Sequence, residues 1–152
     1  MKALVCEGLA DDFSKVRVKQ VEPPSPGPGE VRVRVAAASL NFPDLLMLRG
    51  LYQYRPEAPF VLGSDFAGVI DQLGEGVTAF APGDRVAGGS RAGAFAEYVV
   101  APVYSVSRLP EAFAMPQAAA YPAAYMTACV ALVERANLQA GETLLVHGAS
   151  GG

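Results

Sequence analysis

Alternation of apolar and polar residues dominates the first hundred residues and constrains the fold of this chain more than any other feature. The segments KALVCEG, SKVRVKQVE and EVRVRVAAASL place valine and other apolar residues at alternate positions, often with Arg or Lys between them. Because successive side chains of a strand point to opposite faces of a sheet, this spacing predicts strands with one face turned inward. The stretch PPSPGPG at 23–29 cannot hold a strand ladder and predicts a surface loop.

A short helix and further strands are predicted after these segments. Asn41 precedes FPDLLMLRG, which has a Pro in its first turn, an early Asp and a closing Gly, so a helix is predicted over 42–49. Gly63 and Gly68 lie in an apolar strand-like segment, where they indicate a bulge or the close approach of another backbone. Strands are predicted in 60–74, after the turn in FAPGDRVAGG and in 93–102, and SVSRLP closes the β-rich part.

The stretch at 112–133 carries no charge and is long enough to span a bilayer. Its many alanines gain little from lipid, and two prolines, Gln117 and Thr127 interrupt it, so a buried helical segment is favoured and no membrane contact is expected. The chain is predicted to become helical at Met115, with a longer helix over about 123–136. A turn and a short buried strand, TLLVH, should follow.

Composition restricts the partners and the compartment. The net charge is -3 and the 12 Lys and Arg residues are scattered, which argues against nucleic acid as a partner. Cys6, Cys129 and His147 are the only residues of their types, so they form neither a disulfide framework nor a zinc cluster. The start of the chain lacks the apolar core of a signal peptide, and we expect a cytoplasmic protein that begins at Met1.

The last ten residues, TLLVHGASGG at 143–152, combine a short apolar strand with a Gly-rich turn, as at the opening of a dinucleotide-binding domain. With the fingerprint aligned on Gly151, Ala149 replaces its first glycine and the third would fall beyond Gly152. Taken alone, the segment fits an ordinary strand-to-loop turn equally well. If it is the fingerprint, this chain is the front part of an NAD(P)-dependent oxidoreductase. The expected contacts with its cofactor are then Ala149, Ser150, Gly151 and Gly152.

Six blocks of sequence together resemble a known superfamily. They are NFPDLLMLRGLY, FVLGSDFAGVI, PGDRVAG, GAFAEYVV, YPAAYMTACVAL and GETLLVHGASGG. Their order and spacing resemble the medium-chain dehydrogenase/reductase superfamily, and most of all its NADPH:quinone oxidoreductase branch. The resemblance implies a chain that is mainly β with α, in the α+β class. It further implies a GroES-like β-barrel catalytic domain over 1–122, followed over 123–152 by the incomplete start of a Rossmann nucleotide-binding domain.

The resemblance also implies a reaction without metal. The alcohol dehydrogenase branch has a Cys ligand of zinc where this chain has Asn41, and a His ligand where it has Ser64, and the Cys-rich structural zinc lobe is missing. Without a Lewis acid to stabilise an alkoxide, reduction of an electron-poor acceptor is favoured over alcohol oxidation. The implied cofactor is NADPH, with NADH as the other option, and the implied substrate is a small quinone or enone. The full-length enzyme is expected to be a homo-oligomer, a dimer, and the chain alone to be inactive.

Three side chains are candidates for the site, each with a structural alternative. Asn41 resembles the residue that lies beside the nicotinamide in zinc-free relatives and bonds a substrate or ribose hydroxyl; alternatively it caps a helix. Tyr52 resembles the tyrosine proposed as proton donor in mitochondrial-type enoyl thioester reductases; alternatively it lines or packs a loop. Thr127 corresponds to the superfamily threonine near the nicotinamide carboxamide; alternatively its hydroxyl bonds back to a helix carbonyl. Asn41 and Tyr52 are thus the catalytic candidates, and Asn41 and Thr127 the candidate cofactor contacts.

Two other functions stay open at this point. A 2-enoyl thioester reductase would share the fold and the cofactor, and Tyr52 slightly favours it. A non-catalytic binding or structural protein could also keep this fold. The carboxylates of Asp65, Asp84 and Glu97 are interpreted as structural, because they lie in a turn or in strand-like blocks. Without the remaining walls of the nucleotide domain, the chain should expose apolar surface on its last helix and on TLLVH.

Overall fold

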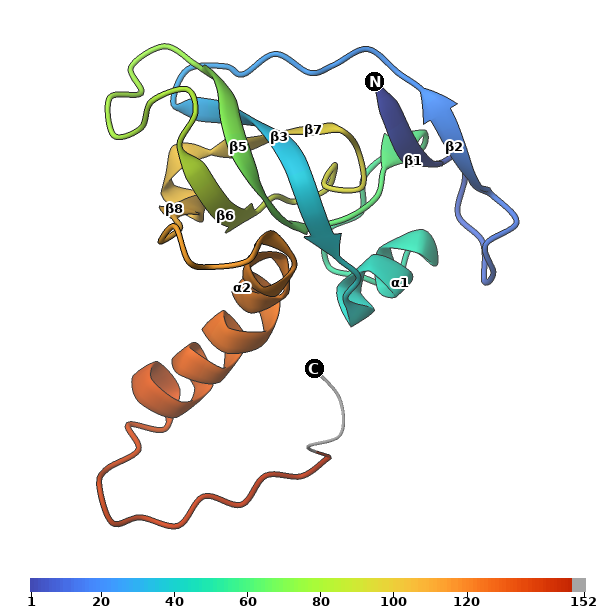
Figure 1. Ribbon diagram of the computed structural model, residues 1–152. Helices are drawn as coiled ribbons and strands as arrows, with labels where there is room; N and C mark the ends of the chain where they lie inside the picture. Colours follow the sequence, from blue (N-terminus) through green and yellow to red (C-terminus); the bar gives the residue numbers. More distant parts are fainter. Residues whose placement is uncertain (149–152) are drawn as a thin grey trace.

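Two antiparallel β-sheets form the body of the molecule in the computed structural model, which describes residues 1–148 (Figure 1). The smaller sheet has the strand order β2-β1-β4 and the larger the order β7-β3-β5-β6-β8. The strands are β1 (Lys2–Cys6), β2 (Val16–Gln20), β3 (Glu30–Ser39), β4 (Phe60–Val61), β5 (Asp65–Leu73), β6 (Arg85–Gly89), β7 (Tyr98–Pro102) and β8 (Val106–Arg108). The prediction of a mainly β chain in the α+β class is confirmed.

The two sheets are joined along β1. The N–H of Leu4 donates to the carbonyl of Phe95 at 2.8 Å, and the carbonyl of Leu4 accepts from the N–H of Leu62 at 3.0 Å. Ala3 and Ala96 form an isolated bridge beside them. The predicted strand over 93–102 is therefore regular only in β7, and its first half serves as a bridge between sheets. The two sheets are thus linked through β1 and the segment before β7, and closure of the predicted barrel stays a prediction.

The inward faces of β3, β5 and β6 supply the main core. Val31 and Val33 of β3 and Phe66 of β5 are fully buried, so the period-2 pattern correctly predicted the inner face of these strands. The pattern was wrong for β2, where Val18 is 71% exposed. This strand lies at the sheet edge and pairs only with β1; Val16 packs against the small core of Cys6, Leu48 and Leu62, but Val18 is left uncovered.

Glycines divide and bend the predicted strand over 60–74. Gly63 adopts φ +94° between β4 and β5, with the Phe95 ring so close that a Cβ would lie 2.4 Å from it. Gly68 in β5 lies beside a register shift against β3, where a Cβ would meet the carbonyl oxygen of Arg34 at 2.1 Å. The predicted close approach of another backbone is confirmed at Gly68.

The first helix, α1 (Phe42–Leu48), confirms the prediction for 42–49. A single-turn 3-10 helix, η1 (Val103–Ser105), precedes β8, and α2 (Met115–Cys129) continues into the π-helical η2 (Val130–Arg135). A separate helix starting near 123 was a wrong prediction, since α2 runs through Pro122 and only loses the hydrogen bond that a proline cannot donate. The predicted domain boundary between 122 and 123 falls inside α2 and stays a prediction.

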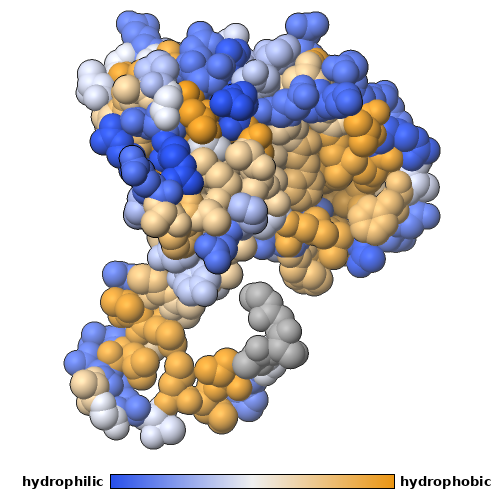
Figure 2. Space-filling model, in the orientation of Figure 1, coloured by the Kyte–Doolittle hydropathy of each residue, from blue (hydrophilic) through white to orange (hydrophobic). Residues whose placement is uncertain are grey.

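Most of the segment predicted to be buried is exposed. In α2 only Ala118 and Ala119 are buried. The TLLVH segment has no regular structure up to its histidine, and Leu145 is 75% exposed, because no strand among residues 1–148 pairs with it. Figure 1 shows α2 leaving the larger sheet after its first turns, and Figure 2 shows apolar side chains on this projecting part. The predicted exposure of apolar surface is confirmed. None of the helices within residues 1–148 is long and apolar enough to cross a bilayer.

Candidate functional site

A pocket of about 740 Å³ opens where α1, the start of β5 and α2 approach one another. Its lining consists of Asn41, Pro43, Tyr52, Gln53, Tyr54, Ser64, Asp65, Ser90, Arg91, Ala123 and Thr127. Three of the predicted site residues, Asn41, Tyr52 and Thr127, therefore meet at one pocket although they are far apart in the sequence. The other four, Ala149, Ser150, Gly151 and Gly152, lie outside the described residues.

The side-chain amide of Asn41 is held by two acceptors on the inner wall of this pocket. Its Nδ2 donates to the Oγ of Ser39 at 3.1 Å and to the Oδ2 of Asp65 at 3.2 Å. The residue also occupies the N-cap of α1, where its backbone N–H donates to the Oδ2 of Asp44 at 2.8 Å. The cap position and the pocket position of Asn41 are thus compatible, and its role in a reaction stays a prediction.

Ser64, at the position of the second zinc ligand in the resemblance, lies on the same wall. Its Oγ donates to the Oδ1 of Asp44 at 3.1 Å. The donors of Asn41 and Ser64 are therefore both engaged with carboxylates. Neither an amide nor a hydroxyl is among the ligands that zinc sites in proteins use.

Two buried carboxylates lie beneath these donors. Asp44 is 2% exposed and Asp65 is 5% exposed, and neither forms an ion pair with a Lys or Arg among residues 1–148. Burial raises the pKa of Asp44, although the N–H of Asn41 and the hydroxyl of Ser64 partly offset this. Burial also raises the pKa of Asp65, against the N–H of Ala123 and the amide of Asn41. The negative charge of Asp44 raises the pKa of Asp65 further.

The interpretation of Asp65 as purely structural was therefore incomplete, because its carboxylate lines the pocket. The same interpretation agrees with the structure for the other two acids. Asp84 pairs with Arg108 at 2.8 Å, and Glu97 accepts the backbone N–H of Lys2 at 2.8 Å.

The variant Asp44→Asn should be more stable than the wild type by about 1 kcal/mol at pH 7, since it removes a buried charge that has no cationic partner. The introduced amide can still accept from the N–H of Asn41 and can donate to Ser64. Because folding raises the pKa of Asp44, the folded wild type takes up a proton before the unfolded chain does. Its stability deficit should therefore shrink as the pH falls from neutral to about 4. Urea unfolding at both pH values measures this difference.

Asp84→Asn is the matched control for Asp44→Asn, and its expected change in stability at pH 7 has the opposite sign. The N–H of Ala81 and then the side chain of Arg108 lower the pKa of Asp84. Loss of this carboxylate should destabilise the fold at pH 7, and the loss should fade as the pH falls through the lowered pKa. A less stable Asp44→Asn variant at pH 7 would contradict our account of the buried carboxylates.

The outer side of the pocket carries aromatic and cationic groups. Tyr52 and Tyr54 are half-buried in the segment after α1, and the guanidinium of Arg91 lies 5.6 Å from the ring centre of Tyr54. Thr127 projects from α2 and is exposed. Within residues 1–148, neither the Tyr52 hydroxyl nor the Thr127 hydroxyl forms a hydrogen bond, and the predicted alternative of a bond from Thr127 back to its helix is not seen. Both hydroxyls are free to meet a ligand.

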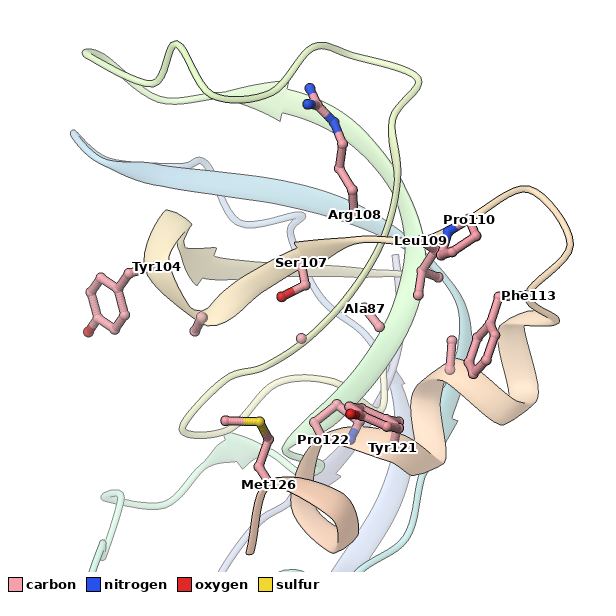
Figure 3. A pocket seen from close by; sticks show the side chains of 13 residues that line it. Ala87, Tyr104, Ser107, Arg108, Leu109, Pro110, Phe113, Tyr121, Pro122 and Met126 are labelled. Atoms are coloured by element: carbon pink, nitrogen blue, oxygen red, sulfur yellow. The ribbon is translucent and has the colours of Figure 1, made fainter. Parts of the chain in front are cut away.

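A second hollow of about 440 Å³ lies between β6, β8 and the first half of α2 (Figure 3). Leu109, Phe113 and Met126 make its wall largely apolar. Its one charged residue, Arg108, is already paired with Asp84. The polar groups that could bind and orient a reacting molecule converge in the first pocket, which is therefore the better candidate.

Comparison with known proteins gives consistent matches. Residues 27–111 match the alcohol dehydrogenase GroES-like domain family. Human quinone oxidoreductase is 43% identical over 117 residues, which cover 76% of this chain and 36% of that protein. A probable oxidoreductase from Mycobacterium abscessus superposes with a TM-score of 0.91 and 39% identity, over 100% of this chain and 48% of the other. Quinone oxidoreductase from Thermus thermophilus, also solved in complex with NADPH, superposes with a TM-score of 0.79 and 34% identity. This match covers 93% of this chain and 43% of the other. The chain spans between a third and a half of these relatives.

Proposed function

Since the chain belongs to the alcohol dehydrogenase GroES-like family of the medium-chain dehydrogenase/reductase superfamily, we propose that its full-length form is an NADPH-dependent reductase of quinones or enones. The observation that carries this proposal is the single pocket that Asn41, Tyr52 and Thr127 share. Relatives named quinone oxidoreductases, one of them solved with NADPH, support it. A cytoplasmic location and a homodimer stay predictions.

The pocket fits one end of a nicotinamide nucleotide. When bound, this cofactor supplies a hydride to the acceptor. Asn41 on the inner wall would hold a ribose hydroxyl, and the free hydroxyl of Thr127 would hold the carboxamide. Tyr52 and Tyr54 offer aromatic surface on the outer side, as a flat acceptor requires. The residues of the Gly-rich turn at 149–152 would bind the pyrophosphate.

We propose a reaction without metal. The positions that correspond to zinc ligands hold Asn41 and Ser64, whose donors are engaged with Asp65 and Asp44. A site with this donor set has no Lewis acid to stabilise an alkoxide, whereas quinones and enones accept a hydride through their own conjugation. The task of the protein is then to orient the acceptor and to let one proton reach it.

Tyr52 is the candidate donor of that proton. Its half-buried hydroxyl has no hydrogen-bond partner within residues 1–148 and lines the pocket. After hydride arrives, the phenol can give its proton to the oxygen or carbon that has become negative, and water then reprotonates the phenolate. A quinone product is a hydroquinone, whose oxygens also take protons directly from water, so Tyr52 matters less for quinones than for enoyl thioesters.

Full-length protein should oxidise NADPH when 1,4-benzoquinone is added, measured as loss of the nicotinamide absorbance. With benzoquinone, Tyr52→Phe should change kcat by less than about threefold; with a 2-enoyl thioester it should lower kcat by about a hundredfold if Tyr52 is the acid. Tyr54→Phe removes the neighbouring hydroxyl and keeps the ring beneath Arg91, so both activities should remain.

The same experiment separates the three candidate functions. Turnover of the enoyl thioester that exceeds quinone turnover and depends on Tyr52 would favour the 2-enoyl thioester reductase. Enoyl thioester turnover that is unchanged in Tyr52→Phe would remove Tyr52 as the acid. Absence of turnover with every quinone and enone would overturn the proposed function in favour of a non-catalytic binding protein.

A further inference from the structure

Asp65 is a buried pocket residue that the reaction described above does not use. Its Oδ2 accepts two hydrogen bonds, from the Nδ2 of Asn41 at 3.2 Å and from the backbone N–H of Ala123 at 2.8 Å. Within residues 1–148 no Lys or Arg pairs with it. A carboxylate held in the interior by neutral donors alone costs stability, so a role in shaping the pocket accounts for its place.

The bond to Asp65 determines which atom Asn41 offers to a ligand. An asparagine amide can be placed with its nitrogen and oxygen exchanged, and its hydrogen-bond partners decide between the two orientations. The Oδ2 of Asp65 accepts one amide hydrogen and the Oγ of Ser39 accepts the other. The remaining polar atom of the amide is Oδ1, which can only accept. Asn41 in this orientation can bind a hydroxyl donor but cannot donate to a carbonyl.

The same carboxylate also bonds the part of the pocket lining that α2 supplies. Ala123 lies one helical turn before Thr127, so the two residues share a face of α2. The hydrogen bond from Ala123 to Asp65 joins this turn of α2 to the first residue of β5. Asp65 therefore links α2, which carries Thr127, to Asn41 at the start of α1.

We propose that Asp65 is a positioning residue, which orients Asn41 as a hydrogen-bond acceptor and anchors α2, so that the pocket selects a ligand with a hydroxyl donor at Asn41. The ribose of a nicotinamide nucleotide presents such a donor. This inference rests on the proposed function for the identity of the ligand, but the contact between Asp65 and Asn41 can be tested without it.

Two substitutions of Asp65 in the full-length protein test this role. In Asp65→Leu, neither the Nδ2 of Asn41 nor the N–H of Ala123 keeps its acceptor, so the amide of Asn41 is no longer held in one orientation. The Kd for NADPH, measured by nicotinamide fluorescence, should rise about tenfold, which corresponds to roughly 1.4 kcal/mol. In Asp65→Asn, the amide oxygen can take the place of the Oδ2 that accepts both bonds, so Kd should stay within about threefold of the wild type.

Two controls complete the experiment. Asp84→Asn changes a carboxylate outside the pocket and should leave Kd unchanged, and thermal melting reports whether each variant is folded. A wild-type Kd in Asp65→Leu, or an Asp65→Asn variant that binds no better than Asp65→Leu, would overturn the positioning role.

A failure of the proposed function can be distinguished from a failure of the positioning role of Asp65. If the wild type binds no NADPH, the side-chain amide resonances of Asn41 in a nuclear magnetic resonance spectrum decide the matter. They should shift in Asp65→Leu if Asp65 orients the amide. Unchanged resonances would overturn the inference whatever ligand the protein binds.

Discussion

The variant Gly68→Ala should lose about 3 kcal/mol of unfolding free energy, the upper part of the range for overpacked cores. A Cβ at Gly68 would lie 2.1 Å from the carbonyl oxygen of Arg34, which belongs to the backbone of β3 and cannot rotate away. β5 pairs with β3 on one side and with β6 on the other, so a displacement of β5 disturbs both ladders of the larger sheet. Urea unfolding of the chain measures the loss.

Gly8→Ala is the matched control, because no atom lies within 4 Å of a Cβ at Gly8. Its unfolding free energy should change by less than about 0.5 kcal/mol. The two variants should share the slope of the wild type against urea, so that the midpoint alone reports stability. A Gly68→Ala variant within about 1 kcal/mol of the wild type would mean that β3 and β5 tolerate a wider separation than this structure has.

Local sequence signals predicted the elements whose determinants are local. The alternation in β3 and the cap and proline of α1 each depend on residues within a few positions, and both elements have nearly their predicted bounds. The alternation in β2 is equally regular, yet Val18 is exposed. Whether an apolar face is covered depends on the order of strands in the sheet, which alternation does not encode.

The same limit explains the errors in the last third of the chain. An apolar composition alone predicted burial for α2 and TLLVH, but burial needs a partner. None of residues 1–148 covers Tyr125 or Leu145, which are 62% and 75% exposed, as expected without the remaining walls of a nucleotide domain. Pro122 suggested an interruption because a proline removes one hydrogen bond; one lost bond does not end a helix whose first turn packs on the larger sheet through Ala118 and Ala119.

In the pocket, the family resemblance pointed to Asn41, Tyr52 and Thr127, whereas Asp65 was overlooked. Its importance depends on Ala123, which lies 58 positions away and bonds to it only in the folded chain. A usable signal was present in FVLGSDFAGVI, because an acid inside an otherwise apolar strand must be buried with partners or displaced. The sequence contained no indication of which partners those are.

The two interpretations of Asn41, a helix cap and a cofactor contact, predict different results for Asn41→Ser in the full-length protein. Serine is as good an N-cap as asparagine, so a residue that only caps α1 would leave turnover unchanged. Serine is shorter and has one oxygen in place of the separate Nδ2 and Oδ1 of asparagine, so it cannot reach Asp65 and a ligand from the two ends of an amide. If Asn41 contacts the cofactor, kcat/KM for NADPH should fall about a hundredfold, or roughly 2.7 kcal/mol.

Gln53→Ser supplies the control for this experiment, because Gln53 is a second amide in the pocket lining and its side chain forms no hydrogen bond within residues 1–148. Its kcat/KM should change by less than about threefold. Both variants should unfold within about 1 kcal/mol of the wild type, since neither leaves a cap empty. A wild-type kcat/KM in Asn41→Ser would assign Asn41 to the cap of α1 alone. The hydrogen bond from Asn41 to Asp65 would then stabilise the fold, and the proton and hydride would have to be directed by Tyr52 and Thr127.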